Sequence, residues 1–296
     1  MAVRLILACV MLFLAAFAVM AGERGVVPSA FATDGSNHVY VRVSINDAKP
    51  VWMLLDTGTS PSTIDRDYAR SIGLTLGRER NIGKGVGGDA IPIAKASVAQ
   101  LRIGGTRRDK VAFEAMPFRF TAPDGETAVG VIGRSALTGR TLVLDYPARQ
   151  VRLTEDSGLA ACRCGAPIKL PYGIPSVRAA LGGRTVDTII DSGGSYDVLI
   201  TPPGASRLGL IEAMNAGQAS TGHGYGGGAP IRSGPGPALK VGDQEKPATA
   251  ITYIALPIKI DAALGTWFLK DYRTTIDYRA RRVLFEPAPS PPRTPR

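Results

Sequence analysis

Two aspartates in this 296-residue chain follow apolar runs in the same local pattern. Asp56-Thr57-Gly58 follows Met53-Leu54-Leu55, and Asp191-Ser192-Gly193 follows Ile189-Ile190. Two carboxyl groups about 3 Å apart cannot both ionise, so they share a proton, and one can act as a base while the other acts as an acid. An Asx turn after a strand explains one such triplet well but two matching triplets poorly. The two aspartates are therefore the candidate catalytic residues.

Few other side chains in the chain could carry out catalysis. With three Cys and only two His, His38 and His223, a Cys/His zinc site is nearly unbuildable, and a serine or cysteine triad has two candidate bases at most. We expect no metal and no cofactor. The net charge of +10 is dispersed along the sequence apart from short runs such as Arg107-Arg108, so we expect no nucleic-acid partner.

The chain contains an internal repeat. The segment VLDYPARQVRL at 143–153 is echoed by TIDYRARRVLF at 275–285, and Val131-Ile132-Gly133 is echoed by Ala263-Leu264-Gly265, both 132 residues later. The two aspartates are 135 residues apart, in the same order. A duplication of about 120 residues per copy is the simplest account and is within the usual domain size. It predicts an N-terminal lobe at 36–155, a linker at 156–166 and a C-terminal lobe at 167–286.

Each copy has the pattern of a β-rich fold. Apolar residues alternate with polar ones over 39–45, and Asn46-Asp47 marks a turn before the apolar run 51–55, which predicts a hairpin leading into Asp56. Short helices are expected at 65–72, ending at Gly73, and at 202–208. The 35 Gly and 22 Pro residues indicate many turns.

The two ends of the chain differ from the rest. Residues 5–22 carry no charge and follow Arg4, so residues 1–21 are predicted to be a signal peptide that directs export to the periplasm or outside the cell. The alternative is an uncleaved membrane anchor formed by residues 5–22. Residues 287–296 contain five Pro and are expected to form a disordered tail.

Two features of the sequence have several interpretations. Cys162 and Cys164 form a C-x-C motif in the predicted linker, where a local disulfide, an intermolecular disulfide and free thiols all remain open. Gly83, Gly85 and Gly88 match a G-x-G-x-x-G pattern, and apolar residues follow at helical spacing, as in dinucleotide sites. The second copy repeats these glycines, but the Pro-rich segment that follows them cannot be a helix, so we interpret both runs as hairpin tips.

These residues resemble the aspartic protease superfamily, specifically bacterial relatives of the retroviral proteases (retropepsin-like) in a two-lobed, pepsin-like arrangement. The resemblance covers about residues 38–286 and rests on the two Asp triplets, Val131-Ile132-Gly133 and Ala263-Leu264-Gly265. It implies a mostly β fold of two homologous acid-protease-like β-barrel lobes, with Asp56 and Asp191 meeting in an active site between them.

The resemblance also implies roles for the residues near the aspartates. Supporting residues of the active-site loops would be Thr57 and Ser192, which cross-link the loops, Gly58 and Gly193, which present N–H groups to the carboxylates, and Ser60 and Ser195, which hydrogen-bond the outer oxygens. Flaps over the substrate would contain Lys84, Gly85, Val86, Gly87, His223, Gly224, Tyr225 and Gly226. The first run lacks a Tyr, which favours the retroviral-like branch with two flaps.

The sequence therefore predicts an exported aspartic endopeptidase that acts as a monomer on protein or peptide substrates. The alternative is a non-catalytic peptide-binding protein on the same two-lobed fold, and a scaffold protein is a distant third. The presence of an aspartate in both triplets favours the enzyme. Contact with a membrane is expected only if the N-terminal segment stays uncleaved.

Overall fold

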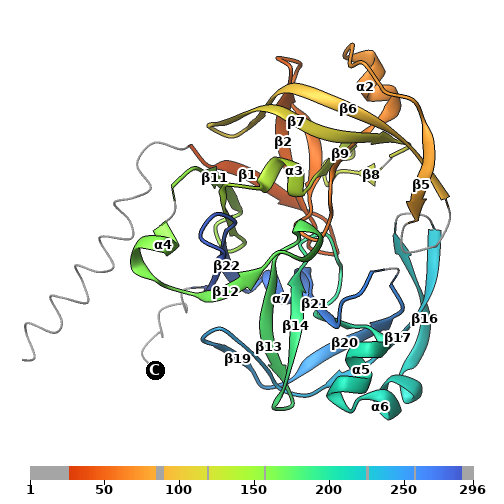
Figure 1. Cartoon of the computed structure of the whole chain (residues 1–296), viewed down its shortest axis with the longest axis vertical. Coiled ribbons are helices and arrows are strands. Elements are labelled where there is room, and N and C mark those ends of the chain that lie inside the picture. Colours follow the sequence, from red (N-terminus) through yellow and green to blue (C-terminus); the bar gives the residue numbers. More distant parts are fainter. Residues whose placement is uncertain are drawn as a thin grey trace, which may run out of the picture.

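A computed structural model describes residues 27–84, 90–118, 120–156, 158–224, 227–256 and 258–288. The predicted signal peptide or anchor lies outside these residues, and so does the predicted tail from residue 289 onward. The described chain is mostly β, with short helices at the ends of strands (Figure 1). No helix within the described ranges is long and apolar enough to span a membrane.

The N-terminal half forms a closed barrel, called here the N-terminal barrel. Its six strands are β2 (Val39–Ile45), β3 (Val51–Leu55), β4 (Ser62–Asp65), β6 (Ala90–Ile103), β7 (Thr106–Met116) and β9 (Thr127–Ile132). Each strand pairs with the next in the ring β2-β3-β9-β4-β7-β6, and the pairing of β6 with β2 closes it. The predicted hairpin is confirmed as β2 and β3, with the alternating apolar residues of β2 buried in the core.

The C-terminal half repeats this order of pairing in a second sheet, called here the C-terminal sheet. Its strands are β13 (Ser176–Leu181), β14 (Arg184–Ile190), β15 (Val198–Ile200), β17 (Gly227–Gly236), β18 (Leu239–Val241), β20 (Thr249–Ile254) and β21 (Ala262–Leu264). The order is β13-β14-β21-β15-β20-β17, and β13 also pairs with β18. β17 and β18 together occupy the place of β6, and the chain divides them at Pro237, which has no N–H to donate to a ladder.

The two halves are joined by a third, six-stranded sheet, called here the shared sheet. Its strands are β1 (Ser29–Thr33), β10 (Thr141–Asp145), β11 (Gln150–Thr154), β12 (Ala166–Lys169), β22 (Tyr272–Asp277) and β23 (Arg282–Pro287). The order is β1-β11-β10-β22-β23-β12, so β10 and β22 form its centre. Val143 faces Thr275, its counterpart in the sequence repeat. On either side, Leu142 pairs with Ile276 and Leu144 pairs with Thr274, so exchanging the two strands converts one of these pairs into the other.

The remaining elements cap or extend these sheets. The other strands are β5 (Arg80–Lys84), β8 (Phe120–Thr121), β16 (Gln218–Gly224) and β19 (Gln244–Lys246). The helices are α2 (Arg66–Ser71), α3 (Arg134–Leu137), α4 (Gly158–Cys162), α5 (Pro202–Leu208), α6 (Ile211–Ala216), α7 (Thr266–Leu269) and the 3₁₀ turn η1 (Pro171–Gly173). The predicted short helices are confirmed as α2 and α5, and Asp65 caps α2 through the N–H groups of Asp67 and Tyr68.

The sequence predictions differ from these elements in three places. β1 lies before the predicted lobe boundary at residue 36, but it belongs to the fold because it pairs with both β2 and β11. The predicted linker contains α4, whose Leu-Ala-Ala core favours a helix, and β12 already begins at Ala166. Pro287, assigned to the tail, ends β23. The apolar residues after the first glycine run lie on strand β6, which pairs with β5, in agreement with the interpretation of that run as part of a hairpin.

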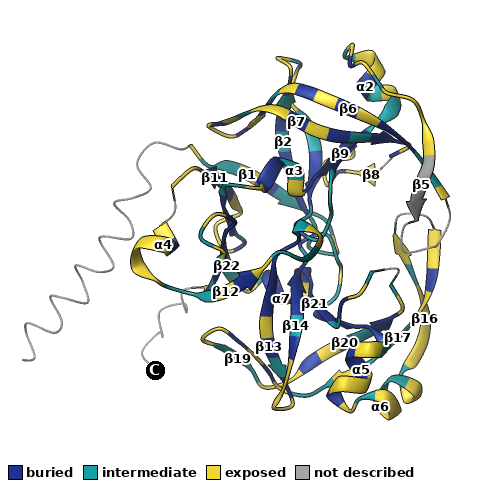
Figure 2. Ribbon diagram, viewed as in Figure 1, coloured by how far each residue is buried: buried dark blue, intermediate teal, exposed yellow. Residues whose placement is uncertain are grey.

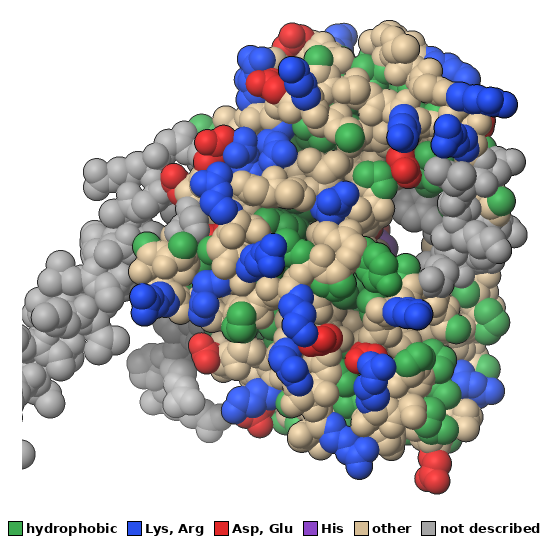
Figure 3. All heavy atoms as spheres, in the orientation of Figure 1, with side chains coloured by type: hydrophobic (Ala, Val, Ile, Leu, Met, Phe, Trp, Pro, Cys, Tyr) green, Lys and Arg blue, Asp and Glu red, His purple; other side chains and the backbone are tan. Residues whose placement is uncertain are grey.

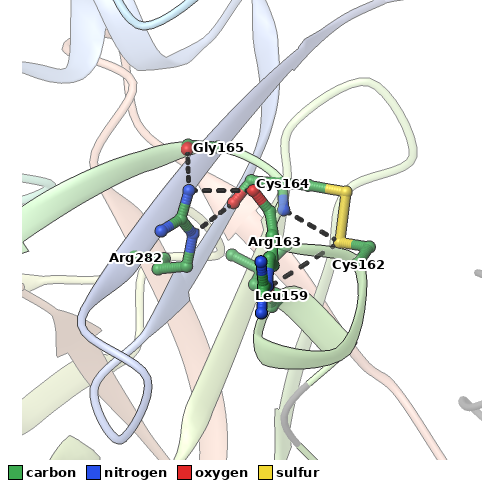
Figure 4. The surroundings of a disulfide bond; sticks show 6 residues. All are labelled: Leu159, Cys162, Arg163, Cys164, Gly165 and Arg282. Atoms are coloured by element: carbon green, nitrogen blue, oxygen red, sulfur yellow. Dashed lines mark hydrogen bonds between the residues drawn. A yellow bond between two sulfur atoms is a disulfide. The ribbon is translucent and has the colours of Figure 1, made fainter.

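The linker contains a local disulfide. Cys162 and Cys164 are bonded to each other, which decides among the three states that the sequence left open (Figure 4). Arg282 on β23 donates hydrogen bonds to the carbonyls of Arg163, Cys164 and Gly165. The guanidinium of Arg282 thus connects the linker to the shared sheet by hydrogen bonds.

Buried apolar side chains run through both halves (Figure 2). One apolar cluster extends from β2 in the N-terminal barrel through the shared sheet to β21 in the C-terminal sheet. On the face drawn in Figure 3, Lys and Arg side chains are scattered among acidic ones, with no single basic patch. Ion pairs such as Lys246–Asp197 (2.8 Å) neutralise part of this charge.

Candidate active site

Both aspartates lie in loops that follow equivalent strands. Asp56 follows β3, which runs parallel to β9, and its N–H donates to the carbonyl of Ile132 at 3.0 Å. Asp191 follows β14, which runs parallel to β21, and its N–H donates to the carbonyl of Leu264 at 2.9 Å. The apolar-apolar-Gly triplets noticed in the sequence therefore hold the two aspartate loops in place.

Thr57 and Ser192 connect the two loops reciprocally. The N–H of Thr57 donates to Ser192 Oγ at 3.0 Å, and the N–H of Ser192 donates to Thr57 Oγ1 at 3.0 Å. Each hydroxyl then donates across the junction, Thr57 Oγ1 to the carbonyl of Ile190 at 2.7 Å and Ser192 Oγ to the carbonyl of Leu55 at 2.8 Å. All four bonds are buried, so they fix the relative position of the loops.

Gly58 and Gly193 bring each loop close to the opposite carboxyl group. Gly58 N–H donates to Asp56 Oδ1 at 2.7 Å, and Gly193 N–H donates to Asp191 Oδ1 at 3.0 Å. A Cβ on Gly58 would overlap the carboxyl of Asp191, and a Cβ on Gly193 would overlap that of Asp56. Only glycine allows this approach.

The two carboxyl groups lie close enough to interact electrostatically. Burial and then the negative charge of Asp191 hold the pKa of Asp56 well above its usual range. A proton that the two carboxyl groups share belongs to the pair as a whole and not to either residue.

The outer oxygens are bound differently from the prediction. Ser60 Oγ accepts a hydrogen bond from Arg134 Nε at 2.8 Å, and Ser195 is exposed, with no hydrogen bond to Asp191 among the described residues. Asp191 Oδ2 instead accepts a hydrogen bond from the hydroxyl of Tyr196. This tyrosine was not predicted from the sequence. The signal that could have identified it is its difference from Pro61, which occupies the same place in the first copy.

The strands that lead into the predicted flaps pair in two hairpins. β5 pairs with β6 up to Lys84 and Ala90, and β16 pairs with β17 up to Gly224 and Gly227. His223 and Gly224 lie at the end of β16, which is exposed along most of its length (Figure 2). Gly85, Val86, Gly87, Tyr225 and Gly226 lie outside the described residues.

A cavity of about 710 Å³ lies beside the C-terminal sheet, and Ser176 and Ile189 are among the residues that line it. Ile189 is two residues before Asp191 and faces Ser176 across the β13–β14 ladder. In the N-terminal barrel the equivalent pair is Leu54 and Tyr40, and the large ring of Tyr40 is buried there. The halves therefore differ in shape near their aspartates.

No group of three or more His, Cys, Asp or Glu that could hold a metal occurs among the residues that the structure describes. His38 Nδ1 is paired with Asp34 at 2.8 Å, close to the contact in which Thr266 Oγ1 donates to the carbonyl of Ser36 at 2.7 Å. His38 therefore lies two residues from a contact between the halves, and it has no hydrogen bond to Asp56 or Asp191 among the described residues.

The closed barrel and its Asp-Thr-Gly loop, linked by hydrogen bonds to the second aspartate loop, agree with the fold expected of an aspartic protease. Residues 41–136 match the family model described as aspartyl protease, so the chain contains an aspartyl protease domain, of the retropepsin-like kind, over these residues. This range includes Asp56 and the Val131-Ile132-Gly133 triplet. No curated protein matches the chain.

Proposed function

We propose that the protein is an exported aspartic endopeptidase in which Asp56 and Asp191 together activate a water molecule. The observation that carries this proposal is the reciprocal bonding of Thr57 and Ser192, which aligns the two aspartate loops. The match of residues 41–136 to the aspartyl protease family supports the same reaction class. Protein or peptide chains are the substrates.

The proposed reaction uses the single proton shared by the pair. The ionised carboxylate takes a proton from a water held between the two groups, and that water attacks the peptide carbonyl. The protonated carboxyl donates a hydrogen bond to the carbonyl oxygen and so stabilises the charge that develops there. A proton then passes to the leaving nitrogen, and the pair returns to its starting state.

We also propose that the two halves arose by duplication and form two lobes of one active site. The equal order of strand pairing in the N-terminal barrel and the C-terminal sheet supports this. A further support is the register of β10 and β22, in which repeat counterparts such as Val143 and Thr275 face each other, as at a twofold axis.

Export is proposed from residues 1–21, whose uncharged stretch has the character of a signal peptide. N-terminal sequencing of protein taken from the producing cells tests this. We expect a start near Gly22, whereas an intact N-terminus in the membrane fraction would establish the anchor.

Peptidase activity is tested by incubating the purified protein with a mixed protein substrate from about pH 3 to 7, with and without pepstatin. We expect cleavage that pepstatin blocks and that the Asp56→Asn protein lacks. Folded protein that binds peptides but cleaves none at any of these pH values would instead favour the non-catalytic binding protein.

A further inference from the structure

Tyr196 is the one hydroxyl donor that the described residues aim at either outer oxygen of the aspartate pair. It stands five residues after Asp191, and the first copy has Pro61 five residues after Asp56. Proline has no hydroxyl, so Asp56 does not receive an equivalent bond. The two aspartates are therefore held asymmetrically, although their loops otherwise match.

The surrounding backbone is shaped to hold the Tyr196 ring. A Cβ on Gly194 would overlap the ring, and a Cβ on Gly265 would overlap the carbonyl and ring edge of the same residue. The first copy has Thr59 at the place of Gly194, so the ring and the space for it occur together in one half only. Trp267 N–H donates to the Tyr196 carbonyl at 3.1 Å, which also fixes the backbone at this position.

A phenolic O–H donates more strongly to a carboxylate than to a neutral carboxyl group, because the acceptor is then charged. The bond to Asp191 Oδ2 therefore favours the state in which Asp191 is ionised. Burial and the charge of Asp191 raise the pKa of the Tyr196 phenol well above its usual range, so Tyr196 remains a donor throughout the acidic and neutral range.

Resting on the function proposed above, we propose that Tyr196 is a positioning residue that keeps Asp191 ionised as the base of the pair and leaves the shared proton on Asp56. Tyr196 does not itself take or give a proton in the reaction. It acts through Asp191. The sequence motif is the same around both aspartates, so Tyr196 is what makes Asp191 the base and Asp56 the acid.

Two further phenols near the pair stay protonated throughout the acidic and neutral range. Tyr146 and Tyr278 lie near the aspartates, and burial raises the pKa of both phenols, with further contributions from Asp34 and Asp191 for Tyr146 and from Asp56 for Tyr278. Asp34 is itself bound to His38. Changes in the acid limb of activity can thus be assigned to the pair when His38 and Asp34 are unchanged.

The test is the pH dependence of kcat/KM in the Tyr196→Phe protein, which loses only the hydroxyl. Removing a donor to the charged form raises the first apparent pKa of the pair, so the acid limb should move to higher pH by about one unit. The alkaline limb should move less, because Asp191 is ionised on both sides of it. Activity at a fixed pH on the acid limb should fall about tenfold.

Tyr253→Phe is the matched control, since the Tyr253 hydroxyl is buried and has no hydrogen-bond partner among the described residues. It should leave both limbs in place. A Tyr196→Phe protein that is folded by its melting temperature but keeps the wild-type acid limb would overturn the proposal. A shift of the same size in both variants would overturn it as well.

A second measurement does not depend on activity. Titration of ¹³C-labelled Asp carboxyls by NMR, with Asp56 and Asp191 assigned from their Asn variants, should show Asp191 ionising before Asp56 in the wild type and a smaller separation in Tyr196→Phe. If this holds but no substrate is cleaved, the endopeptidase proposal fails while the role of Tyr196 stands. If cleavage is normal but Asp56 ionises first, the role of Tyr196 fails alone.

Discussion

Asp56 and Asp191 are each held by a backbone N–H group of their own loop, and their carboxyl groups interact at a site that is partly exposed to solvent. Such a pair acts as a unit, because neither carboxyl group alone can supply both the base and the acid. This arrangement makes each residue individually indispensable.

We expect Asp56→Asn and Asp191→Asn each to lower kcat by about three orders of magnitude or more. Asn matches Asp in shape and its oxygen can still accept from Gly58 or Gly193, so both variants should remain folded. Asp243→Asn on the exposed β18–β19 turn is the control and should retain full activity. Substantial cleavage by either dyad variant would exclude the shared-proton mechanism.

Activity should fall toward alkaline pH, because the raised pKa of Asp56 marks the loss of the shared proton. A second limb should appear at low pH, where both carboxyl groups are protonated and no base remains. Initial rates on a peptide substrate across pH 3 to 9 measure this profile. A profile that is flat over this range contradicts a carboxylate pair.

Stability should show the same titration with a defined sign. A carboxyl group whose folded pKa is raised, as for Asp56, contributes stability that is present below its unfolded pKa near 4 and is lost as pH rises through the folded value. Asn does not titrate, so Asp56→Asn should gain stability relative to wild type between pH 4 and 8, by about 1.4 kcal/mol for each unit of raised pKa. Melting temperatures at both pH values measure it, and an unchanged difference would argue that Asp56 is not perturbed.

At the scale of elements, the junction of the two aspartate loops depends on the hydroxyl groups of Thr57 and Ser192, which lie outside the strands. Thr57→Val preserves the shape of the side chain but leaves the N–H of Ser192 and the carbonyl of Ile190 without their buried partner. We expect a loss of about 2–4 kcal/mol in the free energy of unfolding, measured by urea denaturation. Thr188→Val is the control, because the buried Thr188 hydroxyl has no partner among the described residues, and its removal should be neutral or stabilising. Equal losses in both variants would mean that the cross-link contributes nothing beyond packing.

The elements that the sequence predicted are those with local patterns. The hairpin before Asp56 follows from alternation and a turn pair, and α2 and α5 follow from caps and breakers. The sequence did not predict that β1 joins the shared sheet or that β10 pairs with β22, since these contacts join residues far apart in the chain. Secondary-structure periodicity carries no information about which distant strands meet.

The residues of the candidate site were predictable from the sequence where both copies contain them. Residues that occur in both copies, the two Asp triplets and their glycines, are placed together as expected. Tyr196 and the partner of Ser60 were missed, because they occur in one copy or depend on a side chain from another element. A sequence repeat identifies the site residues that its copies share, whereas site residues that occur in one copy only become apparent in the three-dimensional structure.

At the scale of the whole molecule, one chain contributes both aspartates. Specific activity should therefore stay constant over a dilution of about a thousandfold, whereas a site formed between two chains would be lost by mass action. Mixing the Asp56→Asn and Asp191→Asn proteins should restore no activity. Recovery of cleavage on mixing, or a loss on dilution of the wild type, would contradict the monomer.

The shared sheet also determines how a substrate can enter. Its central strands β10 and β22 come from opposite halves and pair along their whole length, from Thr141 with Asp277 to Asp145 with Arg273. Separating the halves would break the hydrogen bonds between β10 and β22, so we do not expect the shared sheet to act as a hinge. The two hairpins formed by β5–β6 and β16–β17 project from the right edge of the molecule in Figure 1 and share no such ladder with the floor. For the proposed endopeptidase we therefore expect the hairpins, and not a separation of the halves, to admit and release a peptide chain.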